Sequence, residues 1–579
     1  MQTVTTDVLV IGGGATGAGC LRDLAMRGIR AILVEKGDLT HGTTGRYHGL
    51  LHSGGRYVVK DPQSAEECAR ENLVLRRIMP QCIEDTGGFF VATPWDDPAY
   101  GDRFLEGCRR AGVVCQEISV AEALRREPAL NPRISRVFEV NDAAADSFLA
   151  TDLNVDSARQ YGGQAFPYHA VTDLIRVGDR VVGALVQDLS TGETKRIEAA
   201  FVLNAAGAWA GKIAAMAGVK VTVVPGKGVM IAMNHRMVDT VINRCKLPAD
   251  GDIIVPAHTV AVIGTTDRSV PDPDVYGIDP DEVALMLEEG EKLVPGFSRY
   301  RALRAWAGVR PLYKDKDVAD DRDISRTYKL LDHSTRDGVE GFVSIVGGKW
   351  TTYRLMAQEA VDELARKLGN TQPCRTHEEP LPGAVAGRFH WKGERLAHVE
   401  AEDSYGDLIC ECELVTRPQV VESIACGAAN IDDIRRDTRL GMGPCQGGFC
   451  TYRAVALWEE TRGQGAGGRG RQGDGTWQAA NSGRANLPSP PPSHRSPTVD
   501  LQALAVSGAL LRHFLQERWK GLTAVLWGDQ LRQARLDEII FIDTLGVDLL
   551  PREGENSAAG PGLVTQHELI ATEYHEAGG

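Results

Sequence analysis

Three features that would assign this chain to a membrane, secreted or nucleic-acid-binding class are missing from its sequence. No apolar run approaches the roughly 18 residues needed to span a bilayer. The first residues, MQTVTTDVLVIGGG, contain no basic segment followed by an apolar signal core. The net charge of −14 argues against a nucleic-acid partner and gives no support for direct binding to anionic lipid. We therefore expect a cytoplasmic protein, whose reducing surroundings disfavour a disulfide framework.

The composition, 43% hydrophobic and 25% charged over 579 residues, is that of an ordinary globular protein of roughly three or four domains. Residues 1–380 alternate short β-branched strands with helical segments, which predicts an α/β fold. The clearest elements are strands at 7–11, 31–35, 181–187 and 194–202 and helices at 16–27 and 351–368. After them we expect a connector at 381–404, a cysteine module at 405–460, a Gly/Pro/Ser-rich flexible linker at 462–499, a helical segment at 500–552 and a tail at 553–579.

A GGGATG sequence at residues 12–17 follows the first strand and opens the first helix, as a dinucleotide-binding fingerprint requires. Gly12 permits the tight turn, Gly14 lets the backbone approach a pyrophosphate, and Gly17 lets the helix pack on the strand. Glu35 ends the second strand, where a carboxylate can accept hydrogen bonds from the adenosine ribose. A second small-residue turn, LNAAGAW at 203–209, would also let the backbone approach a cofactor. The alternative for this second motif is an ordinary strand–helix turn.

Four of the twelve cysteines lie within 41 residues, as C-x-C, a 32-residue spacer and C-x4-C. They are Cys410, Cys412, Cys445 and Cys450. Two thiolate pairs brought together by a folded spacer suit iron–sulfur or zinc. Zinc sites more often use C-x2-C pairs, which favours a [2Fe-2S] cluster over structural zinc or four unrelated thiols. The other cysteines lack ligand spacing and are expected to be buried or half-buried, Cys426 included.

Several further motifs carry a resemblance to a known family. They are GRYHGLLHSGGRY at 45–57, AGVRPL at 307–312, GGKWTTYR at 347–354, FLQERWKG at 514–521 and WGD at 527–529. In this order they resemble the FAD-dependent glycerol-3-phosphate dehydrogenases. With the cysteine module added, the resemblance is to the large catalytic subunits of the anaerobic enzymes, over about 1–460 and 505–550 of the chain.

The resemblance implies a fold like that of D-amino-acid oxidases, with an FAD domain interleaved with a substrate domain, followed by a small helical domain of the bacterioferritin-associated-ferredoxin type that holds a [2Fe-2S] cluster. It implies oxidation of sn-glycerol 3-phosphate to dihydroxyacetone phosphate. It also implies partner subunits that carry electrons to membrane quinone and hold the protein at the inner face of the membrane. FMN has no support in the sequence.

The matched motifs supply candidate site residues. Arg56, Arg310 and Lys349 could hold a phosphate dianion, with Arg310 suited to bidentate contact. His52 is the candidate general base or hydroxyl-orienting group, with a structural histidine as the alternative. Aerobic relatives carry a histidine after a Lys-Gly pair, whereas this chain has Lys227-Gly228-Val229-Met230, so the identity of the base stays open.

The cofactor-binding candidates include Thr43 and Thr44 for the diphosphate and the helix start after residue 347 for the flavin. The full set is Gly12, Gly14, Ala15, Thr16, Gly17, Glu35, Lys36, Thr43, Thr44, Ala206, Gly207, Gly348, Lys349, Trp350 and Thr351. A GTTD turn at 264–267 also matches the family, but the sequence assigns it no chemical role.

Two other functions are compatible with these patterns. An FAD and [2Fe-2S] dehydrogenase of opines, amino acids or 2-hydroxy acids would carry the same modules, but a carboxylate needs one arginine where a phosphate dianion favours a cluster of cations. An electron-transfer or redox-sensing protein without a substrate is the non-enzymatic alternative.

Overall fold

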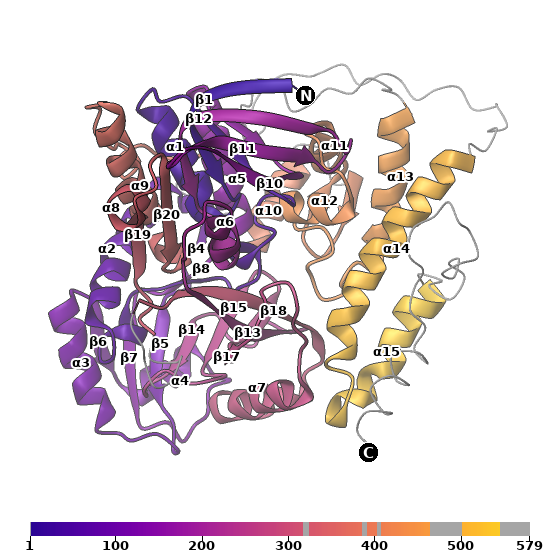
Figure 1. The fold of residues 1–579 in the computed structure, drawn as a ribbon. Helices are drawn as coiled ribbons and strands as arrows, with labels where there is room; N and C mark the ends of the chain where they lie inside the picture. The colour runs from indigo at the N-terminus through magenta and orange to yellow at the C-terminus, as the bar shows by residue number, and fades with distance from the viewer. Residues whose placement is uncertain (1, 316–323, 385–390, 402–406, 464–500, 545–579) are drawn as a thin grey trace, which may run out of the picture. The chain divides into compact units, whose positions relative to one another are not determined.

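The computed structural model describes residues 2–315, 324–384, 391–401, 407–463 and 501–544, which divide into two compact units, Met1–Trp391 and Lys392–Gly579 (Figure 1). The predicted linker, from residue 464 on, and the predicted tail at 553–579 lie outside the described residues. None of the described helices is long and apolar enough to cross a membrane.

The first unit contains a mixed eight-stranded sheet that carries the glycine motif. Its central strands β1 (Gln2–Ile11), β2 (Ala31–Val34) and β12 (Thr194–Asn204) run parallel, with β9 (Gln164–Phe166) beside β2 and β20 (Phe342–Gly347) beside β12. The antiparallel strands are β10 (His169–Val177), β11 (Arg180–Asp188) and β19 (Tyr328–Asp332). The strands predicted at 181–187 and 194–202 are therefore confirmed as a hairpin.

The side chains of β1 point alternately to the two faces of this sheet, which explains why both faces are covered. Val8 and Val10 are buried in one apolar cluster with α1 (Ala15–Met26), α5 (Ser147–Gln160) and α9 (Tyr353–Leu368). Leu9 and Ile11 are buried in a second cluster that includes α6 (Ala210–Met216). Successive side chains of a strand point to opposite faces, so one continuous apolar strand fills two cores.

A second, nine-stranded sheet belongs to the same unit and is interleaved with the first along the chain. Its strands are β5 (Gly88–Ala92), β6 (Cys115–Ile118), β7 (Arg136–Val140), β13 (Val223–Met233), β14 (Val241–Arg244), β15 (Ile253–Ala257), β16 (Val260–Gly264), β17 (Arg268–Ser269) and β18 (Ala302–Tyr313). The helices of this part are α2 (Pro62–Ile78), α3 (Tyr100–Ala111), α4 (Val120–Arg126) and α7 (Pro280–Leu293). A short sheet joins β3 (Leu50–Leu51), β8 (Ala143–Ala145) and β4 (Ile83–Glu84), and α8 spans His333–Asp337.

The helix predicted at 351–368 begins slightly later, because Trp350–Thr352 form a 3₁₀ turn before α9. It ends where predicted, since Gly369 takes the left-handed conformation (φ 70°) that favours glycine at a helix end.

The chain after α9 is bound to the first unit through its backbone. Arg22, a buried side chain of α1, donates to the carbonyl oxygen of Glu379 at 2.7 Å and to that of Thr376 at 3.4 Å. The Leu381 N–H donates to the carbonyl oxygen of Ile78, and Gln81 donates to that of Pro382. Residues 374–384 therefore belong to the first unit.

The second unit is mainly helical. Its elements are α10 (Lys392–Ala401), β21 (Leu408–Cys410), β22 (Val415–Thr416), α11 (Arg417–Ala425), α12 (Ile431–Thr438), α13 (Cys450–Gly463), α14 (Leu501–Thr523) and α15 (Ala534–Glu538). Thr416 and Gln419 form a capping box that fixes the start of α11.

Candidate active site and cluster site

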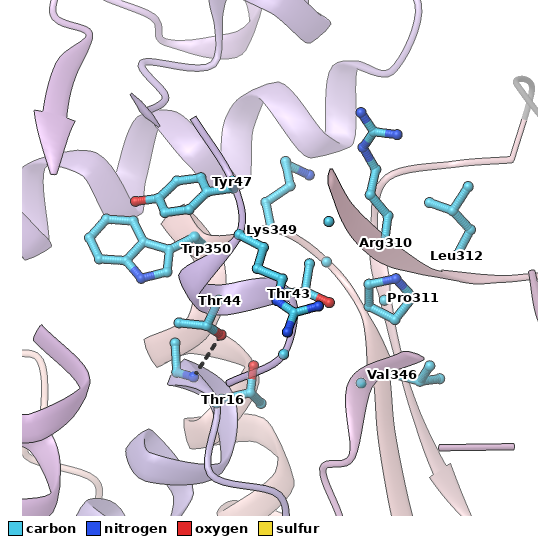
Figure 2. Close-up of a pocket in the computed structure, with 18 of the residues that line it drawn as sticks. Thr16, Thr43, Thr44, Tyr47, Arg310, Pro311, Leu312, Val346, Lys349 and Trp350 are labelled. Carbon is cyan, nitrogen blue, oxygen red and sulfur yellow. Dashed lines mark hydrogen bonds between the residues drawn. The ribbon is translucent and has the colours of Figure 1, made fainter. Parts of the chain in front are cut away.

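The glycine turn between β1 and α1 has no room for a side chain at two positions. A Cβ on Gly12, whose φ is +116°, would lie 2.6 Å from the carbonyl oxygen of Ala205, and one on Gly17 would lie 1.9 Å from that of Gly12. Gly14 has no side chain to cap α1, which leaves N–H groups of the first turn available to a diphosphate. The Thr44 hydroxyl accepts from the Ala15 N–H at 3.1 Å (Figure 2), which places it at the same helix end.

Glu35 is held by the same turn. Its carboxylate accepts hydrogen bonds from the backbone N–H of Gly13 at 2.7 Å and of Gly37 at 2.9 Å. Burial raises the pKa of this carboxyl, and the two hydrogen bonds oppose the shift. The next residue, Lys36, lies 4.2 Å from the centroid of the Trp209 ring. Both residues line the cavity that starts at the glycine turn.

This cavity has a volume of about 750 Å³ and runs from the glycine turn to the substrate candidates. Such a volume is in the range of cofactor-sized ligands. Thirteen of the fifteen predicted cofactor-binding residues line it, as do all four catalytic candidates, His52, Arg56, Arg310 and Lys349. Gly17 does not line it, because it packs against Gly12. Thr351 is buried behind the wall, where its hydroxyl accepts from the His52 N–H at 3.0 Å.

An aromatic pair lines the wall of the cavity near the start of the 3₁₀ turn that precedes α9. Tyr47 and Trp350 are stacked with ring centroids 5.9 Å apart, and Lys349 is drawn beside them in Figure 2. Glycines at 347 and 348 have φ values of 90° and 76°, so the backbone enters this turn in a conformation that other residues rarely adopt. The small residues therefore let the chain deliver a helix start to the cavity.

Cationic side chains gather at the other end of the cavity. Arg56 is paired with the buried Asp252 at 2.7 Å, and Lys349 donates to the carbonyl oxygen of Arg326 at 2.8 Å and lies 4.8 Å from the Tyr57 ring centroid. Arg326 also lines the cavity, and its Nη1 is buried without a hydrogen-bond partner among the described residues. Several cations at one end of a cofactor-sized cavity suit an anionic group such as phosphate.

Arg310 does not have the free fork that bidentate phosphate contact would require. Its Nη1 donates to Asp267 at 3.0 Å and to the carbonyl oxygens of Gly226 and Lys227, and its Nη2 donates to Thr265 and to the carbonyl oxygen of Thr266. Burial and the neighbouring arginines lower its pKa to about 10, which leaves it charged at neutral pH. Its terminal nitrogens are engaged by the protein, so the expectation of bidentate contact is not met in this arrangement.

Two histidines face the same end of the cavity. Burial, together with Arg56 and Arg310, lowers the pKa of His48 to about 3. Burial, His48, Arg56 and Lys349 hold the pKa of His52 well below its usual value. Both rings are therefore neutral at pH 7. The Nδ1 of His48 accepts from the Leu50 N–H at 3.2 Å, which puts its proton on Nε2 and makes that nitrogen a hydrogen-bond donor.

Sequence reasoning missed His48, Tyr57 and Arg326. His48 and Tyr57 lay inside the family-like segment at 45–57, so a signal for them was present. Arg326 has no motif of its own, and only the folded chain places it near Lys349 and Asp267. Lys227, in the pair where aerobic relatives differ, is 3% exposed and bound to Glu282 at 2.6 Å, so it supports the fold beside the site.

The four cysteines of the quartet meet in the second unit. The sulfur atoms of Cys412 and Cys445 are 3.6 Å apart, and Cys410 interacts with both Cys412 and Cys450. Cys412 and burial raise the pKa of Cys445, whereas the backbone N–H groups of Gly447 and Phe449 lower it. Such N–H groups stabilise the thiolates and bridging sulfides of iron–sulfur clusters.

The loop around the quartet depends on glycine. A Cβ on Gly443 would lie 2.4 Å from the Cβ of Cys412, and Gly447 has a φ of +97°. Among the described residues, no three Cys, His, Asp or Glu side chains are arranged to hold one metal ion. Four thiols brought together in this way are the ligand set of a [2Fe-2S] cluster. The expectation that Cys426 is buried was wrong, because it lies exposed at the end of α11.

Comparison with known proteins agrees with both sites. The family model for FAD dependent oxidoreductases matches residues 7–354, and that for the BFD-like [2Fe-2S] binding domain matches residues 408–460. An anaerobic glycerol-3-phosphate dehydrogenase subunit of Haloferax volcanii is 41% identical over 93% of this chain and 91% of its own length. The corresponding subunit of the Escherichia coli K12 enzyme is 39% identical over 94% of this chain and 97% of its own length.

A solved structure shares the fold. The glycerol-3-phosphate dehydrogenase of Bacillus halodurans in complex with FAD has a TM-score of 0.55 at 22% identity and covers 79% of this chain and 89% of its own. The family models, the two relatives and the two assembled sites lead to one assignment. The chain belongs to the family of anaerobic glycerol-3-phosphate dehydrogenase subunits in which an FAD-dependent oxidoreductase domain is followed by a [2Fe-2S] domain.

Proposed function

We propose that the protein oxidises sn-glycerol 3-phosphate to dihydroxyacetone phosphate and passes the electrons through its cluster to partner subunits and membrane quinone. The relatives named above are subunits of anaerobic glycerol-3-phosphate dehydrogenases, which implies further subunits for this chain as well. The observation that carries the proposal is the group of four cations, Arg56, Arg310, Arg326 and Lys349, at the end of a cavity that begins at a dinucleotide fingerprint. FAD, when bound, supplies the two-electron acceptor, and the [2Fe-2S] cluster supplies a one-electron relay.

The side chains divide the work of binding and proton transfer. Lys349 donates to the phosphate, while Arg326 and Arg310 add positive charge beside it. The neutral His52 takes the proton of the C2 hydroxyl as the C2 hydrogen leaves as hydride, and His48 orients the oxygen through its Nε2–H. Asn72 and Thr351 fix His52 through its backbone carbonyl oxygen and N–H.

The location follows from the same proposal. We expect a cytoplasmic protein that lies at the inner face of the membrane through its partner subunits, because the relatives named above are subunits of larger enzymes.

The test is anaerobic dye reduction by the purified protein with glycerol 3-phosphate, an opine, an amino acid and a 2-hydroxy acid. We expect turnover with the phosphate ester and little with the carboxylates, because several cations face the substrate. Turnover with a carboxylate in place of the phosphate would assign the protein to the opine, amino-acid or 2-hydroxy-acid dehydrogenases. Flavin that no substrate bleaches would indicate an electron-transfer protein.

A further inference from the structure

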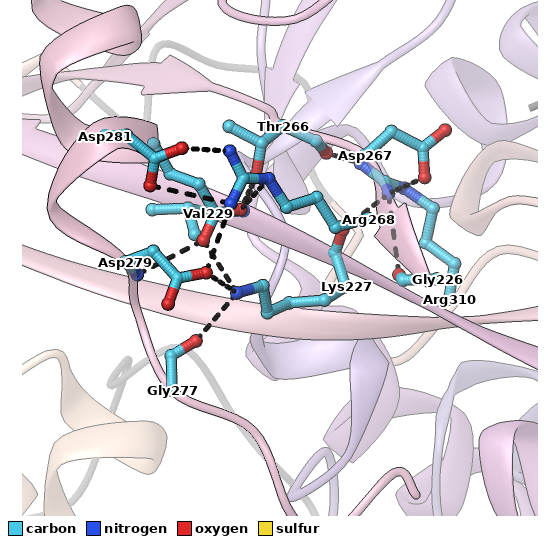
Figure 3. Close-up of polar contacts among 11 residues, drawn as sticks. Gly226, Lys227, Val229, Thr266, Asp267, Arg268, Gly277, Asp279, Asp281 and Arg310 are labelled. Carbon is cyan, nitrogen blue, oxygen red and sulfur yellow. Dashed lines mark hydrogen bonds and ion pairs between the residues drawn. The ribbon is translucent and has the colours of Figure 1, made fainter. Parts of the chain in front are cut away.

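The GTTD turn, residues 264–267 between β16 and β17, has no role in the function described so far. The side chains of Thr266 and Asp267 make contacts with different parts of the fold. Thr266 is buried and bonded to Glu282 of α7, whereas Asp267 contacts Arg310 (Figure 3) and also Arg326. The turn therefore connects a fixed support to the substrate end of the cavity.

The support is a buried ionic network at the start of α7. The Thr266 hydroxyl donates to Glu282 at 2.7 Å and accepts from the Val229 N–H at 3.0 Å. Glu282 is fully buried and is held by Lys227 at 2.6 Å, and Lys227 also contacts Asp279 at 3.1 Å. Pro280 and the capping box between Asp279 and Glu282 fix the helix start itself. Movement of Thr266 would break buried charged contacts, so the turn is held in place.

On the cavity side, Asp267 holds two arginines at once. One carboxylate oxygen accepts from Arg310 at 3.0 Å and the other from Arg326 at 2.5 Å. The Thr265 hydroxyl and the Thr266 carbonyl oxygen accept hydrogen bonds from Nη2, the other terminal nitrogen of Arg310. Gly228 makes room for this arrangement, because a Cβ there would lie 2.4 Å from that nitrogen. Two guanidinium groups that would repel each other are thus kept together by one carboxylate.

We propose that Asp267 is a positioning residue that fixes Arg310 and Arg326 relative to each other, so that both guanidinium groups present their positive charge to the phosphate of the substrate. This rests on the proposed function, because the phosphate is the ligand it assigns to this end of the cavity. Asp267 touches neither substrate nor flavin in this role and acts only through the two arginines.

The direction in which phosphate affinity changes distinguishes a positioning role of Asp267 from a purely electrostatic one. The substitution Asp267→Asn removes a negative charge beside the anion site, so electrostatics alone would tighten phosphate binding. Loss of positioning would weaken it. We expect the KM for glycerol 3-phosphate and the inhibition constant of inorganic phosphate to rise together by about tenfold, the effect of one charge-assisted hydrogen bond. We expect kcat, flavin content and Tm to stay near those of the wild type.

Asp281→Asn is the matched control, since Asp281 pairs with Arg268 in the same network but is 67% exposed and does not line the cavity. It should leave the KM for glycerol 3-phosphate and the inhibition constant of inorganic phosphate unchanged.

A second variant, Thr265→Val, removes only one acceptor of Arg310. It should raise the same two constants by a smaller factor, and it replaces Asp267→Asn in the test if that variant does not fold.

Unchanged or tighter phosphate binding in Asp267→Asn would overturn the proposal, and so would a joint loss of Tm and flavin. If the wild type does not oxidise glycerol 3-phosphate, the proposed function fails. Titration of the bound flavin spectrum with inorganic phosphate would still decide the role of Asp267.

Discussion

In the first unit the groups around the cavity come from positions as distant as Gly12 and Lys349, whereas in the second the four thiols come from 41 consecutive residues. The flavin site therefore needs the whole interleaved fold of two sheets, and each of its walls depends on the others. The cluster site needs one glycine-rich loop with the short elements around it. We therefore expect that a mutation can disable either redox site without disabling the other. Changes in packing should disable the first site, and loss of a single cysteine ligand should disable the second.

The largest effect is expected from adding a side chain to the glycine turn of the first site. Gly12→Val places a β-branched residue at φ +116° and a Cβ 2.6 Å from the Ala205 carbonyl oxygen. We expect bound flavin to fall below about one tenth of one per chain, because the turn can no longer approach the diphosphate. The flavin released on denaturation measures this.

The matched control for this change is Gly393→Ala, whose added Cβ meets open space. It should retain its flavin. Normal flavin content in Gly12→Val would contradict the view that this turn holds the cofactor, and loss of iron from the same variant would contradict independence of the two sites.

A smaller effect is expected from removing one cluster ligand. Cys450→Ser should lower bound iron and sulfide below about one tenth of the wild-type content, since all four thiolates are needed. Flavin content and the rate at which glycerol 3-phosphate bleaches the flavin should stay within about twofold, because the first unit has its own core. Metal and sulfide assays with anaerobic stopped-flow spectroscopy measure both.

Cys426→Ser is the control, because this thiol is exposed and outside the quartet. If Cys450→Ser also abolished flavin bleaching, the substrate site would depend on the cluster unit, and the contrast drawn above would be wrong.

The smallest effect concerns pH. The pKa of His52 is held well below 6.5, so the ring is neutral, and able to accept a proton, at every pH above that depressed value. Falling pH should therefore change kcat at saturating glycerol 3-phosphate by less than about twofold between pH 8 and pH 6, whereas an unperturbed histidine would lose much of its neutral form over this range. An acid limb of kcat centred near 6.5 would show that the base has an ordinary histidine pKa, which contradicts the lowered pKa of His52. The exposed His513, replaced by Gln, is the control.

Local sequence patterns predicted the parts of this protein that depend on near neighbours. The glycine turn, the strands beside it, the end of α9 at Gly369 and the cysteine quartet all follow from spacing or from backbone preference. Partners chosen by the fold could not be predicted. Nothing near Arg310 in the sequence shows that Asp267 and Thr265 occupy its nitrogens, or that the Nη1 of Arg326 has no hydrogen-bond partner among the described residues. Cys426 was misplaced because burial of a short helix end depends on what packs over it.

The contacts of Arg22 bear on where a flavin domain could be cut. The match to the oxidoreductase family ends at residue 354, yet this buried guanidinium is satisfied by carbonyl oxygens of residues 376 and 379. A fragment ending at 354 would lose most of α9 and both carbonyl acceptors of this guanidinium. The smallest self-sufficient flavin module is therefore longer than the segment that the family model matches and extends at least through Pro382.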